Sequence, residues 1–152
     1  METRLQFLEQ LPVSVQYQEE GMAAVLTSSE SDLEIRVYDC PEDDFTPYIV
    51  CYATQHAHLC DEEDVLEMVE DVISGRLCAI EFFKGEARCL GGDIEAEYLD
   101  HLSLDTLKEA FSPLDVGRLL KKADTFQIRG WKKDHNLDGT IRADGTIQVK
   151  RV

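Results

Sequence analysis

Long apolar runs are absent from this 152-residue sequence, which has nothing close to the ~20 residues that a membrane-spanning helix needs. The N-terminus also lacks the basic and then apolar segment of a secretory signal. The five cysteines are odd in number and form no Cys-x-x-Cys pair, which argues against a disulfide framework. Together these absences predict a soluble, untargeted protein of the reducing cytoplasm.

Basic side chains are scarce, with 15 Lys and Arg against 31 Asp and Glu, for a net charge of −16. Residues 1–117 hold 27 acidic and six basic side chains, net −21, whereas residues 118–152 hold four acidic and nine basic, net +5. Such a field repels nucleic acid and anionic membranes and speeds the encounter with a basic partner. We therefore expect neither nucleic acid nor membrane as a partner, although solubility alone would also explain the charge.

The strongest structural signals lie between Tyr48 and Gly75. The run from Tyr48 to Thr54 is uncharged and rich in β-branched and aromatic residues, which predicts a central strand covered on both faces. A helix is predicted over 62–74, capped by Asp61 and stopped by Gly75. Its apolar stripe has helical spacing and consists of Val65, Met68, Val69, Val72 and Ile73.

The remaining pattern predicts one α+β domain with an antiparallel-rich sheet of about six strands. We expect a short helix within 2–11, and strands at 13–17, 22–27, 33–38, 77–83, 87–90 (broken by Gly91-Gly92) and 125–131. Helical segments are expected from 95 to 123, one of them opened by a capping box at 112–115. The main helix and these segments would pack on the sheet. Residues 1–123 would form the acidic α+β domain, and 124–152 a basic C-terminal β-hairpin extension of it.

Two segments contain residue types that bind metals. His56, His58 and Cys60 would point to one side of a continuing strand, as zinc ligands could. We favour a strand that ends in two half-exposed histidines, with Cys60 packed under the helix. Asp134–Gly139 matches the first half of a calcium loop, yet the twelfth position is Gly145 and the flanks resemble strands. We predict a turn there, and neither a metal nor another cofactor.

Several residues have side chains that could combine into a catalytic site, but no characteristic spacing in the sequence links them. Glu81 lies within an apolar strand and Asp93 follows the double glycine, so one buried and one exposed carboxylate could divide acid and base roles. Cys51 or Cys60 with His56 could form a thiolate pair. No local motif ties either set together, and we predict no catalytic site.

One succession of segments resembles a known family. It comprises Tyr48-Ile-Val-Cys-Tyr-Ala-Thr-Gln-His-Ala-His58, the acidic amphipathic helix, Ala79-Ile-Glu-Phe-Phe83 and Gly91-Gly-Asp-Ile-Glu95. Over residues 46–112 it is similar to small immunity proteins of bacterial polymorphic and contact-dependent toxin systems. The resemblance implies a protein that binds one cognate toxin in the cytoplasm of the producing cell and blocks its active site or an essential surface.

Toxins of this kind are often nucleases with basic clefts, which an acidic face could occupy. The predicted partner-binding residues are therefore the exposed helix face and the preceding loop, namely Asp43, Asp44, Glu63, Glu67, Glu70 and Asp71. Two alternatives stay open. One is a small acidic adaptor or regulatory protein that binds a basic segment, and the other is a metal-dependent enzyme using His56, His58 and Cys60.

Overall fold

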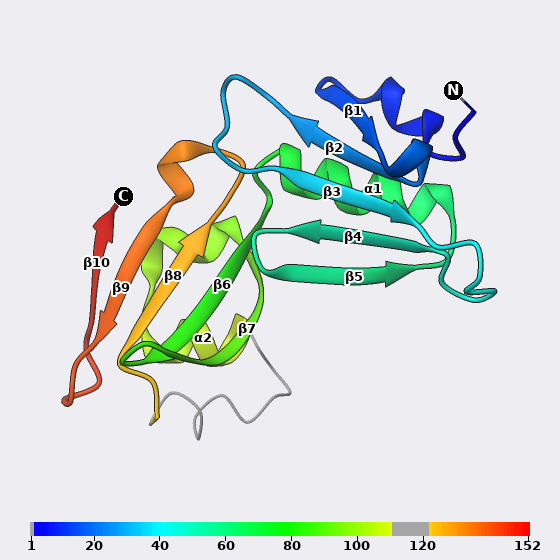
Figure 1. The fold of residues 1–152 in the computed structure, drawn as a ribbon. Coiled ribbons are helices and arrows are strands. Elements are labelled where there is room, and N and C mark those ends of the chain that lie inside the picture. Colours follow the sequence, from blue (N-terminus) through cyan, green and yellow to red (C-terminus); the bar gives the residue numbers. More distant parts are fainter. Residues whose placement is uncertain (1, 111–121) are drawn as a thin grey trace. The chain divides into compact units, whose positions relative to one another are not determined.

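The computed structural model describes residues 2–110 and 122–152 (Figure 1). The chain divides into two compact units, Met1–Ser74 and Gly75–Val152, which we call unit 1 and unit 2. Each contains a five-stranded sheet in which all described neighbours are antiparallel. The predicted α+β class and the antiparallel pairing are confirmed. The single sheet of about six strands is wrong, because β6 opens a second sheet after the main helix.

Unit 1 is a β-meander with strand order β1-β2-β3-β4-β5, so each strand pairs with the next along the chain. Its elements are the 3-10 helix η1 (Gln6–Gln10), β1 (Ser14–Gln18), the 3-10 turn η2 (Glu19–Gly21), β2 (Ala23–Thr27), β3 (Ile35–Asp39), β4 (Tyr48–Tyr52), β5 (Gln55–Leu59) and helix α1 (Glu62–Ile73). The predicted strands at 13–17, 22–27 and 33–38 correspond to β1, β2 and β3.

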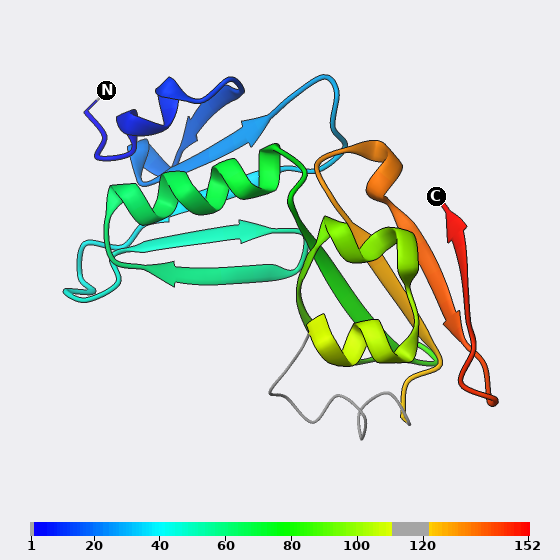
Figure 2. The ribbon, with the colours of Figure 1, turned by 180° about the vertical axis from the view of Figure 1, so that it is seen from behind.

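Helix α1 covers one face of this sheet (Figure 2). Its buried residues Val65, Val69 and Val72 come from the predicted apolar stripe, and the facing side of β4 buries Tyr48, Val50 and Tyr52. The Asp61 carboxylate accepts a hydrogen bond from the Asp64 backbone N–H at 2.8 Å, as predicted for an N-cap. Gly75 follows the helix with φ +83°.

Strand β4 is shorter than predicted, and one of its two faces is less buried than predicted. It ends at Tyr52, the chain reverses through Ala53-Thr54, and β5 returns beside it with Cys51 opposite His56. Its second face, with Ile49 and Cys51, is only half-buried. Ala53 sits at φ +49°, a conformation unfavourable for a residue with a Cβ, and Ala53-Thr54 contains none of the glycine or asparagine that predicts such a turn.

Unit 2 has the strand order β10-β9-β8-β6-β7. Its elements are β6 (Leu77–Lys84), β7 (Ala87–Glu95), the 3-10 helix η3 (Ala96–His101), helix α2 (Leu104–Ala110), β8 (Thr125–Arg129), the 3-10 turn η4 (Lys133–His135), β9 (Leu137–Ile141) and β10 (Ile147–Arg151). Residues of η3 and α2 pack on a core built around Ile80, Phe82 and Phe126. The C-terminal hairpin is confirmed as β9 and β10, with Gly145 at φ +85° in its turn.

The double glycine does not break its strand. β7 continues to Glu95, with Gly91 opposite Glu81 and Gly92 opposite Ile80, and the irregularity in pairing lies at Phe82/Phe83. Glycine keeps its ladder hydrogen bonds in extended backbone, so β6 can template the whole strand despite the missing side chains. The helix predicted to open at 112–115 lies outside the described residues.

Candidate protein-binding surface

The negative charge of the protein belongs to unit 1. Its 74 residues contain 18 acidic side chains and two basic ones, Arg4 and Arg36, for a net charge of −16. Unit 2 contains 13 acidic and 13 basic side chains and has no net charge. The whole excess of carboxylates therefore lies on one five-stranded sheet, its covering helix and their loops.

Three of the four predicted helix residues form one exposed stripe. Glu63, Glu67 and Glu70 follow one another at four and three residues and are all exposed, on the side of α1 opposite its buried valines. Asp71, the fourth predicted residue, is half-buried and lies at the edge of this exposed stripe. We call Glu63, Glu67 and Glu70 the helix face.

The loop between β3 and β4, residues 40–47, has a defined hydrogen-bonded shape. The Cys40 N–H donates to the Pro47 carbonyl at 2.6 Å, which closes its two ends. The Asp43 carboxylate accepts from the backbone N–H groups of Phe45 at 3.1 Å and Thr46 at 3.0 Å, and from the Thr46 hydroxyl at 3.1 Å. These bonds, above all the one from the Thr46 backbone, hold the pKa of Asp43 below its ordinary value.

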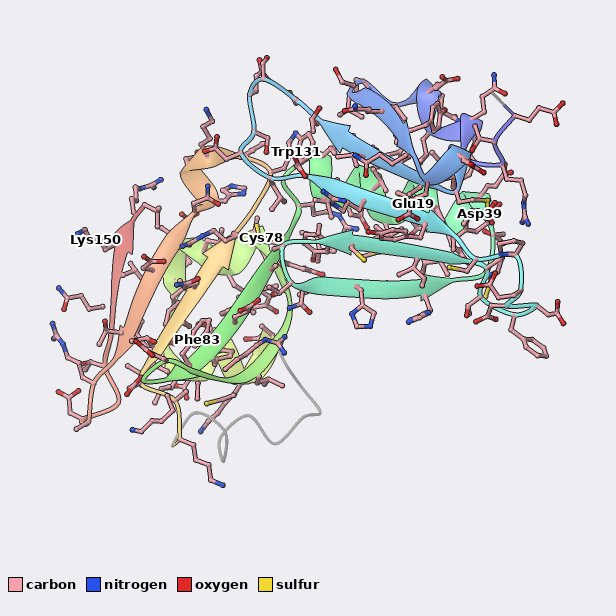
Figure 3. The ribbon with its side chains drawn as sticks, viewed as in Figure 1. Glu19, Asp39, Cys78, Phe83, Trp131 and Lys150 are labelled. Atoms are coloured by element: carbon pink, nitrogen blue, oxygen red, sulfur yellow. The ribbon has the colours of Figure 1, made fainter. Side chains whose placement is uncertain are left out.

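Carboxylates from three segments converge at the base of this loop. Burial raises the pKa of the Cys40 thiol, and the charges of Glu42, Asp39, Asp43 and Glu19 raise it further. The Asp39 N–H donates to the Met22 carbonyl at 2.8 Å, which joins the β1–β2 turn to the end of β3. Figure 3 shows Glu19 and Asp39 at this end of the sheet. We call Glu19, Asp39, Glu42 and Asp43 the acidic tip.

Asp39 is the one buried charged residue of the described chain, and it is paired within unit 1. Arg4 Nη1 lies 3.6 Å from its Oδ1. The same guanidinium lies over the Tyr48 ring, 5.7 Å from its centroid, and its Nη2 donates to the Tyr48 hydroxyl at 3.5 Å. The Tyr48 hydrogen bond and the Asp39 charge raise the pKa of Arg4. One of the two cations of unit 1 is thus engaged beneath the acidic tip.

The acidic tip and the helix face lie in the same unit and share one end of it. Helix α1 begins at the end of the sheet from which loop 40–47 projects (Figures 1 and 2). Glu63 is in the first turn of α1, and Glu67 and Glu70 lie progressively further from that end. The structure therefore brings the predicted Asp43 and Asp44 to the end of the unit where the predicted helix residues start.

Sequence reasoning missed Glu19, Asp39 and Glu42. Glu42 adjoins the predicted Asp43, so its position in the loop was an available signal. Glu19 and Asp39 are 20 residues apart and both come near Cys40 only because β2 pairs with β3, with Ala23 opposite Tyr38. That register is not visible in the sequence.

The two histidines and the cysteine considered as zinc ligands do not lie on one strand, and Cys60 is exposed rather than packed under the helix. His56 and His58 lie on the edge strand β5, both exposed, with ring centroids 5.4 Å apart in an edge-to-face arrangement, and Cys60 follows the strand. Within residues 2–110 and 122–152, no group of three or more His, Cys, Asp and Glu side chains is arranged to hold a metal ion. Asp138 of the calcium-loop match lies in β9, where its carboxylate is 2.9 Å from Arg129 Nη2.

The catalytic candidates have their own partners. Glu81 and Asp93 project from the same face of β6 and β7, and Glu81 lies 3.8 Å from Arg88 Nε. Burial raises the pKa of the Cys51 thiol, which faces His56 across the β4–β5 pair. A raised thiol pKa disfavours the thiolate that a nucleophile needs.

A second cysteine–histidine pair, unforeseen in the sequence, lies in unit 2. Cys78 Sγ is 3.6 Å from His135 Nδ1, but burial raises the pKa of the Cys78 thiol to about 11. This contact therefore packs a neutral thiol against the ring. The nearby hollow of about 560 Å³ is lined by Asp100, Asp134, His135 and Arg151 among others, and Arg151 Nη1 donates to the Asp134 carbonyl at 2.7 Å.

Comparison with family models, with curated proteins and with solved structures finds no match for this chain. Among the helices that the structure describes, none combines the length and the apolar character required to cross a membrane.

Proposed function

We propose that this protein is an immunity protein, which binds a cognate toxin with a basic surface through unit 1 and neutralises it in the cytoplasm of the producing cell. The observation that carries the proposal is the concentration of the net charge of −16 in unit 1. The helix face and the three exposed carboxylates of the acidic tip, Glu19, Glu42 and Asp43, would present this charge to the partner, with Asp44 and Asp71 beside them. Asp39 is buried and paired with Arg4, so it would support the tip rather than contact the partner.

The electrostatics support a fast and specific encounter with a basic protein. A surface of one sign raises the association rate toward an oppositely charged site by roughly 10- to 1,000-fold at low ionic strength. The same surface repels nucleic acid, so it can occupy a cleft shaped for phosphates without binding the toxin's own substrate. Asp43 is held in place by its loop hydrogen bonds, which reduces the ordering that binding would require.

The test uses the polypeptide encoded directly upstream of this gene, where a toxin is expected. Co-expression should relieve its toxicity, and the purified pair should associate more slowly as salt is raised. Reversing Glu63, Glu67 and Glu70 to lysine should slow association about tenfold at low salt.

The matched control reverses three exposed carboxylates of unit 2, Glu86, Asp105 and Glu109, to lysine. Both triple variants have the same net charge, so a slower rate confined to the first locates the interface on the helix face. Equal rates for the two variants would remove the helix face from the interface. A partner that binds without being toxic would favour the adaptor alternative.

A further inference from the structure

One aromatic side chain lies in solvent within the acidic loop. Phe45 is 86% exposed, more than any other large apolar residue of the described chain, where the next are Val152 at 70%, Val149 at 45% and Met22 at 38%. A scattered exposed apolar residue is ordinary on a protein surface. Phe45 differs because its backbone is fixed and its neighbours are charged.

The loop holds Phe45 in a defined position. Its backbone N–H is bound to the Asp43 carboxylate, and the loop ends are joined through Cys40 and Pro47. An aromatic anchor presented from an ordered backbone loses little conformational entropy when it is buried by a partner. Aromatic residues at such positions dominate the energetics of many interfaces.

The surroundings of Phe45 select the chemistry of the partner. Glu42, Asp43 and Asp44 precede it in the sequence, and Met22, a second exposed apolar residue, follows the β1–β2 turn that is bonded to Asp39 at this end of unit 1. An aromatic ring could also stack on nucleobases, but a protein site that binds nucleic acid by stacking also needs a cationic groove. Unit 1 has two basic residues, and one is engaged by Asp39. The surface that complements Phe45 and the carboxylates around it therefore belongs to a protein.

We propose that Phe45 is the anchor of the interface, inserting its ring into an apolar pocket that is rimmed by lysine and arginine side chains on the basic partner. This inference rests on the proposed function and adds to it the residue that determines how long the complex lasts. The acidic residues would accelerate association, whereas Phe45 would slow dissociation.

The experiment measures binding of the full-length protein to the purified polypeptide encoded directly upstream, by surface plasmon resonance at low and at physiological salt. Phe45→Ala should weaken binding about 30-fold, mostly through faster dissociation, because a truncated anchor costs a factor of this size. Phe45→Leu should lie between Phe45→Ala and wild type. The loss should persist at the higher salt, unlike that of the charge-reversal variants.

The control is Val152→Ala, which truncates another highly exposed apolar side chain but in unit 2, and it should bind within twofold of wild type. Since the Phe45 ring is exposed, circular dichroism and the thermal midpoint should show that Phe45→Ala is folded. If wild type binds and Phe45→Ala binds equally well, the anchor is refuted and the proposed function stands. If wild type does not bind, the proposed function and the anchor both fail.

Discussion

Position 139 in β9 accommodates only glycine, because the Phe126 ring occupies the space that a Cβ would need. It pairs with Phe126 of β8, and a Cβ built on Gly139 would overlap three atoms of that ring. The ring is fully buried and packs on Phe82 at a centroid distance of 5.8 Å, so it has little space into which to move. Gly139→Ala should therefore cost about 2 kcal/mol of unfolding free energy, measured by urea denaturation.

A double-mutant cycle identifies the cause of that loss. In a Phe126→Val background the ring is absent, so adding Gly139→Ala should cost markedly less than it does in wild type. Equal costs in the two backgrounds would show that the strain arises elsewhere than at the ring.

Cys60 and Cys78 should be the most and the least reactive thiols. Cys60 is exposed, whereas Cys78 is fully buried with a pKa of about 11. With Ellman's reagent at pH 8, Cys60→Ser should remove the fastest phase of the folded protein. Cys78→Ser should leave the native phases unchanged and lower the total in denaturant from five thiols to four. Rapid native labelling at Cys78 would contradict its burial.

At the scale of elements, α1 depends on its N-cap. The Asp61 carboxylate satisfies the Asp64 N–H, one of the four unpaired donors at a helix start. Asp61→Ala should destabilise the protein by about 1 kcal/mol, and Asp61→Ser should recover most of it because serine can accept the same bond. Thermal or urea unfolding of both variants measures this. A similar loss for serine and alanine would mean that the cap bond contributes little.

Loop 40–47 should respond to acid through Asp43. Because hydrogen bonding lowers the pKa of Asp43 from its ordinary value of 3.8, the carboxylate stabilises the loop above that value, and the effect is lost as pH falls through the lower, folded-state pKa. In an NMR titration, the amide resonances of Phe45 and Thr46 should shift with a midpoint below 3.8. Asp43→Asn should abolish that transition, and a midpoint at or above 3.8 would contradict the bonded geometry.

The elements with strong local signals were predictable, and their assembly was not. α1, β1, β2 and the C-terminal hairpin carry periodicity, capping or turn residues that act over a few positions. The reversal at Ala53-Thr54 lacks glycine and asparagine, so the sequence contains no sign of the turn that separates β4 from β5. Whether strands join one sheet or two depends on pairing between distant segments, which local patterns do not encode.

The residues of the candidate binding surface also divide into those that local sequence signals predict and those that depend on the pairing of distant segments. Asp43 and Asp44 could be chosen because they are adjacent in an acidic loop, and the helix face could be chosen from its helical spacing. Glu19 and Asp39 reach the acidic tip only through strand register, and the exposure of Phe45 follows from a loop closed by hydrogen bonds. The partner-binding role of all these residues remains a prediction.

For the molecule as a whole, the charge of unit 1 should make stability depend on salt. Its 18 acidic residues, offset by only two basic ones, repel one another within a compact fold. Raising ionic strength from 0.01 to 0.15 M shortens the Debye length from roughly 30 to 8 Å and so screens this repulsion. The thermal midpoint should therefore rise by a few degrees, as followed by circular dichroism. The neutralised variant Glu63→Gln, Glu67→Gln, Glu70→Gln should respond less, and a midpoint that falls with salt would contradict the repulsion.

The uneven distribution of basic residues also determines where the protein can be modified chemically. Unit 1 contains no lysine, and the first along the chain is Lys84. Amine-directed dyes, cross-linkers and coupling surfaces will therefore attach to unit 2 or to a chain-terminal amine. A protein immobilised in this way keeps its acidic tip, its helix face and Phe45 chemically unaltered, whereas carboxyl-directed coupling would consume the very groups proposed to bind.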